Sequence, residues 1–288
     1  MYRNIGFFFL FLGILGCSSF PYQDLIEESV RYIEANHPEG HSNLEIDGER
    51  WHFFRLANPT KPLLLLIHGS PGSWQAYAHF FKSPRLVENF ELIAFDRFGY
   101  GKNRRGLPHG KLDDQIQIPL KLIENFAGSR PVIVVGHSYG GPVAVKLAQM
   151  YPKKVQALIL LAAAVDPDLE ETLWYQNIAK QWGIRSLIPS ALDVCNREIL
   201  ALKDELKIMA SSYGKINQPV FVVQGTIDKL VPKENVDYLK RKLKKEQLHI
   251  TTLKEGRHFI PWAFPGQVEA AIVKASQFIN SNGKSSSP

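Results

Sequence analysis

The sequence lacks several patterns, and each absence narrows what it can do. It has no cluster of ligands at metal-binding spacing and no phosphate-cradling glycine loop, so we expect neither a metal nor an organic cofactor. It has no internal repeat and no linker rich in proline, glycine or serine, which predicts one large domain. With 45% hydrophobic and 22% charged residues, its composition excludes disorder and fibrous repeats.

The longest apolar run, Ile5 to Leu15, is too short to cross a membrane. It follows a single positive charge at Arg3. A spanning helix needs about 20 apolar residues, whereas a shorter run behind a positive charge is typical of a signal peptide. At the end of this run, Ile14-Leu15-Gly16-Cys17 resembles the bacterial lipobox. The resemblance implies a signal peptide over residues 1–16, lipidation of Cys17, and an exported lipoprotein anchored in a membrane of the bacterial cell envelope.

The chain has two cysteines, and their fate depends on this signal. After an ordinary export signal, Cys17 and Cys195 could form a disulfide. If Cys17 carries lipid instead, Cys195 is left as a structural thiol on the apolar face of a helix. Several acyl chains on one cysteine would anchor the protein firmly, because each buried methylene adds about 0.8 kcal/mol.

Negative charge is also in short supply, because the formal net charge is +6. Part of the excess lies in the run from Lys240 to Lys245. Such a run can bind anionic lipid or nucleic acid, or it can be the solvated end of a helix. No aromatic interleaving and no nucleic-acid motif accompany it, so we favour the solvated helix and expect no nucleic-acid partner.

Short apolar runs alternate with helical patterns along most of the chain. Runs bounded by glycine, proline or aspartate are typical of parallel strands buried on both faces. They are Leu63 to Ile67, Leu92 to Phe95, Val132 to Val135, Leu158 to Leu161 and Val220 to Val223. Helical patterns include Tyr22 to Asn36, Asp113 to Phe126, Ser138 to Met150 and Lys233 to Leu243. The alternation predicts an α/β fold with a mostly parallel central sheet and helices on both faces.

One segment, at about residues 166–213, has helical patterns only. An insertion of this kind after a strand is expected to form a small helical cap over the active site. We therefore expect a single domain over residues 17–288 that carries this cap.

The strongest chemical signal is Gly136-His137-Ser138-Tyr139-Gly140, which lies directly after an apolar strand and before a helix. This context is that of a nucleophile elbow, in which a tight turn projects the serine hydroxyl from the sheet edge. A serine hydroxyl needs a base to take its proton. We predict that base to be His258, in the loop after the expected last strand, Leu248 to Leu253.

The base needs a carboxylate that holds one imidazole tautomer and stabilises the imidazolium. In hydrolases with such an elbow, the acid lies between the serine and the histidine in the sequence. Asp228 lies there, in the loop directly after the strand Val220 to Val223. The developing oxyanion also needs N–H donors. We assign these to the backbone of Ser70, in the loop His68-Gly69-Ser70-Pro71-Gly72, and to the backbone of Tyr139.

These motifs together resemble the α/β-hydrolase superfamily from roughly Leu44 to Ser281. The loop His68 to Gly72 and the motif Asp96-Arg97-Phe98-Gly99-Tyr100-Gly101 are similar to the branch that contains epoxide hydrolases, haloalkane dehalogenases, proline iminopeptidases and small esterases. Epoxide hydrolases and dehalogenases use aspartate at the elbow. Because this chain has Ser138 there, the resemblance implies a serine hydrolase that transfers an acyl group to water.

The bond that is cleaved has several candidates. Cleavage of a carboxylic ester of a small or lipid-like substrate needs an apolar acyl pocket. Apolar cap residues could line this pocket, or they could only pack the cap onto the core; they are Leu173, Trp174, Trp182, Leu187 and Ile188. An aminopeptidase of the proline iminopeptidase type would need cap carboxylates for the substrate amine, although such charges are usually solvated; the candidates are Glu170, Glu171, Glu198, Asp204 and Glu205. Its loop would also be expected to carry a second glycine where Ser70 stands.

Hydrolysis of a carbon–carbon bond is a third option. A non-catalytic binding lipoprotein would show a broken triad, and no member is missing.

Overall fold

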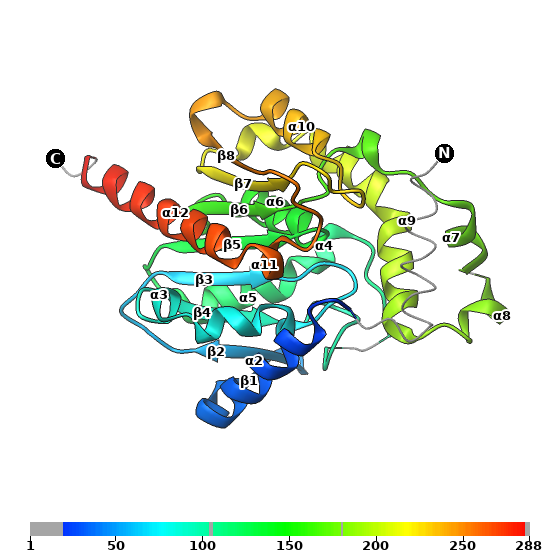
Figure 1. The fold of residues 1–288 in the computed structure, drawn as a ribbon, viewed down its shortest axis with the longest axis horizontal. Helices are drawn as coiled ribbons and strands as arrows, with labels where there is room; N and C mark the ends of the chain where they lie inside the picture. The colour runs from blue at the N-terminus through cyan, green and yellow to red at the C-terminus, as the bar shows by residue number, and fades with distance from the viewer. Residues whose placement is uncertain (1–19, 104–105, 180, 286–288) are drawn as a thin grey trace.

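The computed structural model describes residues 20–103, 106–179 and 181–285. Cys17 and the predicted signal peptide lie outside this part of the chain. The described residues form an eight-stranded sheet in the order β1-β2-β4-β3-β5-β6-β7-β8 (Figure 1). Strand β2 is antiparallel to both of its neighbours, and the other neighbouring pairs are parallel. The strands are β1 (His41–Ile46), β2 (Glu49–Leu56), β3 (Leu63–Ile67), β4 (Glu91–Phe95), β5 (Val132–His137), β6 (Ala157–Leu161), β7 (Val220–Gly225) and β8 (Leu248–Leu253).

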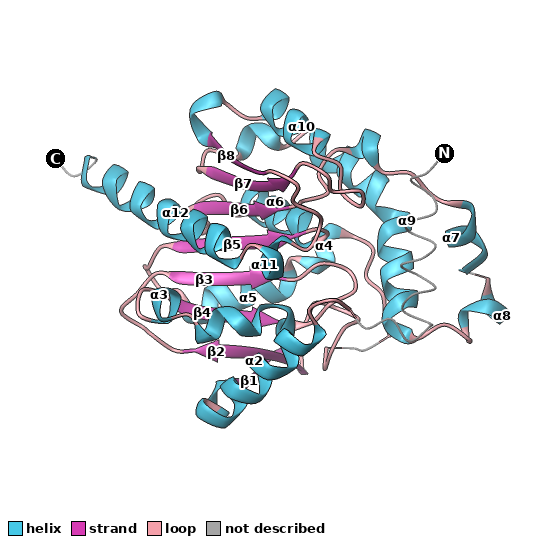
Figure 2. Ribbon diagram, viewed as in Figure 1, coloured by secondary structure: helices cyan, strands magenta, loops and turns pink. Residues whose placement is uncertain are grey.

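Helices cover both faces of this sheet, as predicted (Figure 2). One face packs on α4 (Leu112–Gln115), α5 (Gln117–Phe126), α6 (Gly140–Met150) and α10 (Glu234–Lys242). The other face packs on α2 (Gln23–Asn36), the 3-10 helix η2 (Trp74–Lys82), α3 (Pro84–Val87), α11 (Ile260–Ala263) and α12 (Pro265–Ser285). Two short 3-10 turns, η1 (Pro38–Gly40) and η5 (Lys245–Gln247), directly precede β1 and β8.

Strand β3 shows why the strand sequences are continuously apolar. Leu63 and Leu65 belong to the core on one face of the sheet, whereas Leu64 and Leu66 belong to the core on the other. All four side chains are fully buried. Because successive side chains of a strand point to opposite faces, both alternating sets must be apolar when helices cover both faces.

Two predicted helices begin or break elsewhere than expected. The expected helix from Ser138 begins at Gly140, because Ser138 has a φ of 53° and so cannot start a right-handed helix. The expected helix over Asp113 to Phe126 is divided into α4 and α5. Pro119 lies in the first turn of α5, where its missing N–H costs no hydrogen bond, whereas one continuous helix would place it in the interior.

The segment between β6 and β7, which we call the cap segment (residues 166–213), contains helices and no strand among its described residues. Its elements are η3 (Pro167–Leu169), α7 (Trp174–Ala179), α8 (Trp182–Arg185), α9 (Ser190–Ala210) and the start of η4 (Tyr213–Lys215). The long helix α9 packs on the core through Leu202, Leu206 and Met209. Figure 1 shows α9 between the sheet and the smaller helices α7 and α8. Across the described chain, no helix combines the length and hydropathy that a membrane crossing requires.

Candidate active site

Ser138 occupies a tight turn between β5 and α6. Its φ of 53° lies in the left-handed region, which is uncommon for a residue that has a side chain. Two backbone hydrogen bonds hold this conformation: the Ser138 N–H donates to the Leu161 carbonyl at 2.9 Å, and the Gly141 N–H donates to the Ser138 carbonyl at 2.9 Å. The surrounding sheet therefore fixes a strained residue at its edge, as is common at functional sites.

The glycines that flank Ser138 are required by close packing. A Cβ atom at Gly136 would lie 2.3 Å from the carbonyl oxygen of Gly140. A Cβ atom at Gly140 would lie 2.3 Å from the carbonyl oxygen of Ile67 in β3. Any side chain at these positions would push α6 away from the sheet. The spacing of the motif is thus a steric condition for this turn.

The structure brings Ser138, His258 and Asp228 together, although they are far apart in the sequence. His258 Nε2 lies 3.0 Å from Ser138 Oγ. His258 Nδ1 lies 2.9 Å from Asp228 Oδ2. Because an ionised carboxylate only accepts hydrogen bonds, it favours the tautomer with hydrogen on Nδ1 and leaves Nε2 free to accept from the serine hydroxyl. The geometry is that of a hydroxyl, a base and an orienting acid.

Asp228 is held by the loop that follows β7. Its second oxygen, Oδ1, accepts hydrogen bonds from the Leu230 and Val231 N–H groups, both at 2.9 Å. This loop meets the His258 loop where a Cβ atom at Gly225 would lie 2.2 Å from the carbonyl oxygen of Gly256. The absence of a side chain at both glycines lets the loops approach. A glycine at the end of β7 and a second glycine in the loop after β8 are therefore the sequence signal of this contact.

Two buried histidines support the site without touching the Ser138 hydroxyl. His137 Nε2 lies 3.0 Å from the His258 carbonyl oxygen, so it donates its hydrogen to that oxygen. His68 Nδ1 donates to the Gly69 carbonyl at 2.7 Å, while His68 Nε2 accepts from the Arg97 N–H at 3.0 Å. Burial lowers the pKa of His68 to about 3 with help from the Arg97 charge, and burial lowers the pKa of His137 to about 3 with help from His258.

These pKa shifts predict a fold that loses stability in mild acid. The unfolded chain binds a proton at each histidine near pH 6.5, whereas folded His68 and His137 stay neutral until about pH 3. The unfolded state therefore binds more protons, and stability is full above pH 6.5 and falls as the pH drops below it. We expect the free energy of unfolding to fall by about 1 kcal/mol between pH 7 and pH 6, and by nearly 3 kcal/mol per pH unit below pH 6. Urea titrations at several pH values would measure this, and a flat profile from pH 7 to pH 5 would contradict it.

The predicted oxyanion loop lies against the nucleophile. A Cβ atom at Gly69 would be 3.0 Å from Ser138 Cβ, so the loop can come this close only with glycine there. Within residues 20–103, 106–179 and 181–285, neither the Ser70 N–H nor the Tyr139 N–H donates to another protein group. Both donors are thus available to a bound oxygen.

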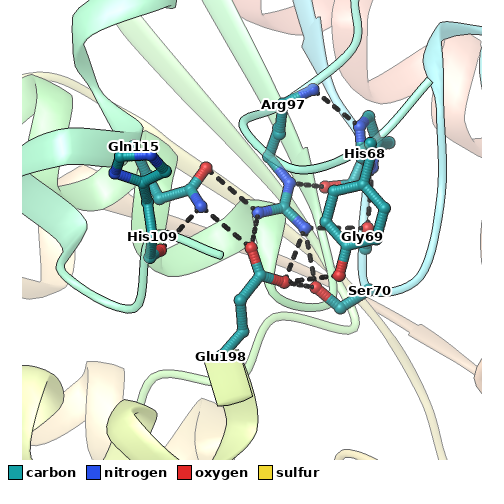
Figure 3. A network of polar contacts seen from close by, with 8 residues as sticks. His68, Gly69, Ser70, Arg97, His109, Gln115 and Glu198 are labelled. Atoms are coloured by element: carbon teal, nitrogen blue, oxygen red, sulfur yellow. Dashed lines mark hydrogen bonds and ion pairs between the residues drawn. The ribbon is translucent and has the colours of Figure 1, made fainter. Parts of the chain in front are cut away.

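Behind this loop lies a buried ion pair that the sequence did not reveal (Figure 3). Arg97, which follows β4, and Glu198, on α9 of the cap segment, are both fully buried, and Arg97 Nη1 lies 2.7 Å from Glu198 Oε1. Burial alone would lower the pKa of Arg97, but the Glu198 carboxylate raises it above its ordinary value. The guanidinium is therefore charged and needs its partner.

The Arg97–Glu198 pair connects the cap segment to the oxyanion loop. Arg97 donates from Nε to the His68 carbonyl at 3.0 Å and from Nη2 to the Gly69 carbonyl at 3.1 Å. Glu198 Oε2 accepts from Tyr100 OH at 2.7 Å and from Ser70 Oγ, and Gln115 donates to Oε1 at 2.9 Å. Figure 3 shows these groups converging on the guanidinium and the carboxylate. The loop carbonyls are thus turned toward Arg97, away from the nucleophile.

The motif that begins at Asp96 shapes the turn next to this pair. Asp96 accepts from the Trp74 and Lys102 N–H groups at 3.0 Å and faces His52 Nδ1 at 3.3 Å. Burial alone would raise the pKa of this carboxyl, but the hydrogen bonds from His52, Lys102 and Trp74 hold it below its ordinary value. Gly101, with a φ of 51°, lies so close that a Cβ atom there would be 2.1 Å from the carboxylate. Asp96 therefore has a structural task.

A cavity of about 550 Å³ opens over Ser138 and His258. Its size is ordinary for a small-molecule site. Much of its lining is apolar and comes from the N-terminal segment, the cap segment and the loops around His258: Phe20, Ile26, Leu173, Ile199, Leu202, Val231, Phe259 and Trp262. Cys195 is a buried free thiol on α9 and does not line it.

Of the cap residues that were candidates either for lining an acyl pocket or for packing the cap on the core, most do not line the cavity. Leu173 lines the cavity. Trp174 and Leu187 instead have exposed fractions of 67% and 82%, and Ile188 does not line the cavity. The side chain of Trp182 lies outside the described residues. The expected pocket therefore forms, but largely from other side chains.

The cap carboxylates differ in their surroundings. Glu198 is buried in the ion pair with Arg97 and is not solvated. Glu205 accepts from the Leu112 N–H at 2.9 Å, and Asp204 is exposed beside Lys207. Glu170 and Glu171 line the cavity. In the described part of the chain, no three histidine, cysteine, aspartate or glutamate side chains are placed to hold a metal ion.

Comparisons with known proteins agree with this fold. Residues 62–183 match the model of the alpha/beta hydrolase fold family. Epoxide hydrolase 4 of Mus musculus is 30% identical over 116 residues, which are 40% of this chain and 32% of that protein. Lipase LipV of Mycobacterium tuberculosis is 35% identical over 108 residues, which are 36% of this chain and 38% of that protein. The chain thus spans about a third of the length of the curated relatives that it matches.

A solved structure extends the likeness over nearly the whole chain. The crystal structure of a membrane phospholipase A, a bacterial virulence factor, is similar with a TM-score of 0.64 and 19% identity, over 97% of this chain and 99% of that one. At this identity the likeness concerns the fold. Together with the family model and the sheet order, it leads to one conclusion: the chain has the α/β-hydrolase fold.

Proposed function

We propose that the chain is a serine hydrolase that cleaves a carboxylic ester of a small or lipid-like substrate through an acyl-enzyme on Ser138. The observation that carries this proposal is the pair of contacts at His258: Nε2 is 3.0 Å from Ser138 Oγ and Nδ1 is 2.9 Å from Asp228. Ser138 and His258 line a largely apolar cavity. An exposed hydroxyl with an oriented base beside it is the arrangement that nucleophilic acyl transfer needs.

The reaction would begin when His258 Nε2 takes the hydroxyl proton and Ser138 Oγ bonds to the ester carbonyl carbon. The Ser70 and Tyr139 N–H groups would donate to the resulting oxyanion, a contribution worth about 3 kcal/mol or more per donor. The carbon–oxygen bond to the alcohol then breaks, and His258 gives its proton to the leaving alkoxide. Water deprotonated by His258 attacks the acyl-enzyme and releases the carboxylic acid and Ser138.

Two observations favour an ester over an amine-bearing peptide. The cavity presents apolar side chains to the acyl group. Among the cap carboxylates, Glu198 is fully committed to Arg97, Tyr100 and Gln115, and so it cannot also bind a substrate amine. Glu170 and Glu171 line the cavity, and an aminopeptidase would have to use these.

The test is a pair of substrate panels for the full chain, nitrophenyl acyl esters and aminoacyl anilides. We expect turnover of the esters with an optimum in acyl-chain length, because the apolar cavity is finite and adds stabilisation only for the methylenes that it can bury. Cleavage of the anilides alone would replace the ester proposal by a peptidase. Absence of turnover together with absence of labelling by a fluorophosphonate would leave a binding lipoprotein.

A further inference from the structure

The N-terminal end of the described chain forms part of the cavity mouth. Phe20 lines the cavity, and its ring lies 5.0 Å from that of Phe259 and 5.2 Å from that of Trp262, both edge to face. Phe259 directly follows His258. The chain therefore enters the fold beside the histidine of the site, and not at a remote surface.

The short stretch of chain before Phe20 limits the distance between the cavity and the N-terminal apolar run. Only a few residues separate Phe20 from the apolar run that ends at Leu15, and fewer still separate it from Cys17. A fully extended chain spans at most about 3.6 Å per residue, so the stretch from Leu15 to Phe20 can span at most about 18 Å and the stretch from Cys17 to Phe20 at most about 11 Å. If the apolar run or a lipid on Cys17 holds the protein in a membrane, the cavity mouth lies close to the bilayer.

The cap segment presents apolar side chains next to the same cavity. Four large apolar side chains are exposed between Trp174 and Leu187, with exposed fractions of 67%, 43%, 42% and 82% for Trp174, Ile178, Ile184 and Leu187. In the rest of the described chain, such exposed side chains are single and lie on different helices, strands or loops. Leu173, the neighbour of Trp174, lines the cavity, so this surface adjoins the mouth.

The charge of the sequence that carries these four side chains fits a lipid bilayer. From Leu173 to Pro189 the sequence has two basic residues, Lys180 and Arg185, and no acidic residue. Apolar side chains with a few cations among them are the composition that helices have when they lie in a membrane interface with anionic lipids. Figure 1 shows α7 and α8 at the outer edge of the molecule, with α9 between them and the sheet.

We infer that the surface formed by Trp174, Ile178, Ile184 and Leu187, which we call the cap apolar surface, docks on the bilayer to which the N-terminus tethers the chain. The docked cavity then takes its substrate from that bilayer, so the substrate class is a long-chain acyl ester dissolved in lipid. This inference rests on the ester hydrolysis proposed above. It names the bilayer as the source of the substrate. From a docked cavity, an ester that is dissolved in the lipid can reach Ser138 without crossing water.

The test uses the full chain in vesicles of phosphatidylethanolamine and phosphatidylglycerol, with two substrates that share a leaving group. Methylumbelliferyl oleate dissolves in the bilayer, and methylumbelliferyl acetate stays in water. The test variant is Ile178→Ser with Leu187→Ser. Its matched control is Met150→Ser with Ile250→Ser, which makes the same kind of change on exposed side chains of α6 and β8. Met150 ends α6, about 16 Å along the helix axis from the elbow.

We expect the test variant to hydrolyse the oleate at least about tenfold more slowly, because it loses two apolar side chains that enter the lipid. Its turnover of the acetate should equal that of the unaltered chain, and the control variant should be unchanged on both substrates. Equal oleate turnover in the test and control variants would overturn the inference. A change in oligomeric state with unchanged oleate turnover would also overturn it and would assign the surface to a second copy of the chain. Absence of acetate turnover in the unaltered chain would instead contradict the proposed function.

Discussion

Replacing Ser138 by alanine should abolish ester hydrolysis and leave the fold intact. The Ser138 hydroxyl is the group that His258 Nε2 contacts at 3.0 Å, and the proposed acyl-enzyme forms on that hydroxyl. Loss of a catalytic serine lowers turnover by roughly 10⁴- to 10⁶-fold, because the residual rate comes only from substrate binding and the oxyanion donors. The measurement is kcat on nitrophenyl esters, together with loss of fluorophosphonate labelling.

The matched control for this variant is Ser73→Ala. Ser73 lines the same cavity, and its side chain makes no capping hydrogen bond at the start of η2. We expect its kcat to stay within about twofold of the unaltered chain, since changes of this kind away from the reacting groups are nearly neutral. Both variants should unfold at the same urea concentration as the parent. Substantial turnover by Ser138→Ala would mean that another nucleophile acts.

The parts of the site that are encoded locally could be predicted from the sequence. The elbow shows itself because a strand, two glycines and a helix must follow each other within a few residues, and the structure gives the steric reason at Gly136 and Gly140. Asp228 follows a strand with a visible apolar run, and His258 follows the expected last strand, so their place at one sheet edge followed from the parallel order. The sheet and its helical layers were therefore predicted correctly.

The sequence did not predict which side chains of the cap segment face the core, because the short helices there have no sequence signal that fixes their orientation. Leu187 was a candidate for the pocket or for packing on the core and is exposed, whereas Phe20 and Phe259 line the cavity from outside the cap segment. Glu198 was grouped with carboxylates that are usually solvated. Its partner Arg97 is far away in the sequence, and only the tertiary fold brings the two together. A charged side chain can be buried when the fold brings a partner of opposite charge to it, and a partner that is distant in the sequence leaves no local sequence pattern.

Replacing Glu198 by glutamine should remove much of the stability of the fold. The variant keeps the side-chain volume but leaves the fully buried Arg97 guanidinium without a counter-charge. Breaking a buried ion pair by removing one partner costs about 3–5 kcal/mol, which is a large share of the roughly 5–15 kcal/mol that stabilise a domain. The glutamine NH₂ group would also face donors from Arg97, Ser70 or Tyr100, where the carboxylate accepted hydrogen bonds. Urea unfolding at pH 7 measures the loss.

The same substitution should also slow the reaction, because Arg97 donates hydrogen bonds to the His68 and Gly69 carbonyls. A guanidinium that shifts toward water would release the loop that carries the Ser70 N–H. We expect kcat on soluble esters to fall more than KM rises, since an oxyanion donor acts mainly on the transition state. Asp204→Asn on the same helix is the control, and its exposed carboxylate should leave both stability and kcat unchanged. If Glu198→Gln lost stability but kept its full kcat, the ion pair would hold the cap segment in place without positioning the oxyanion loop.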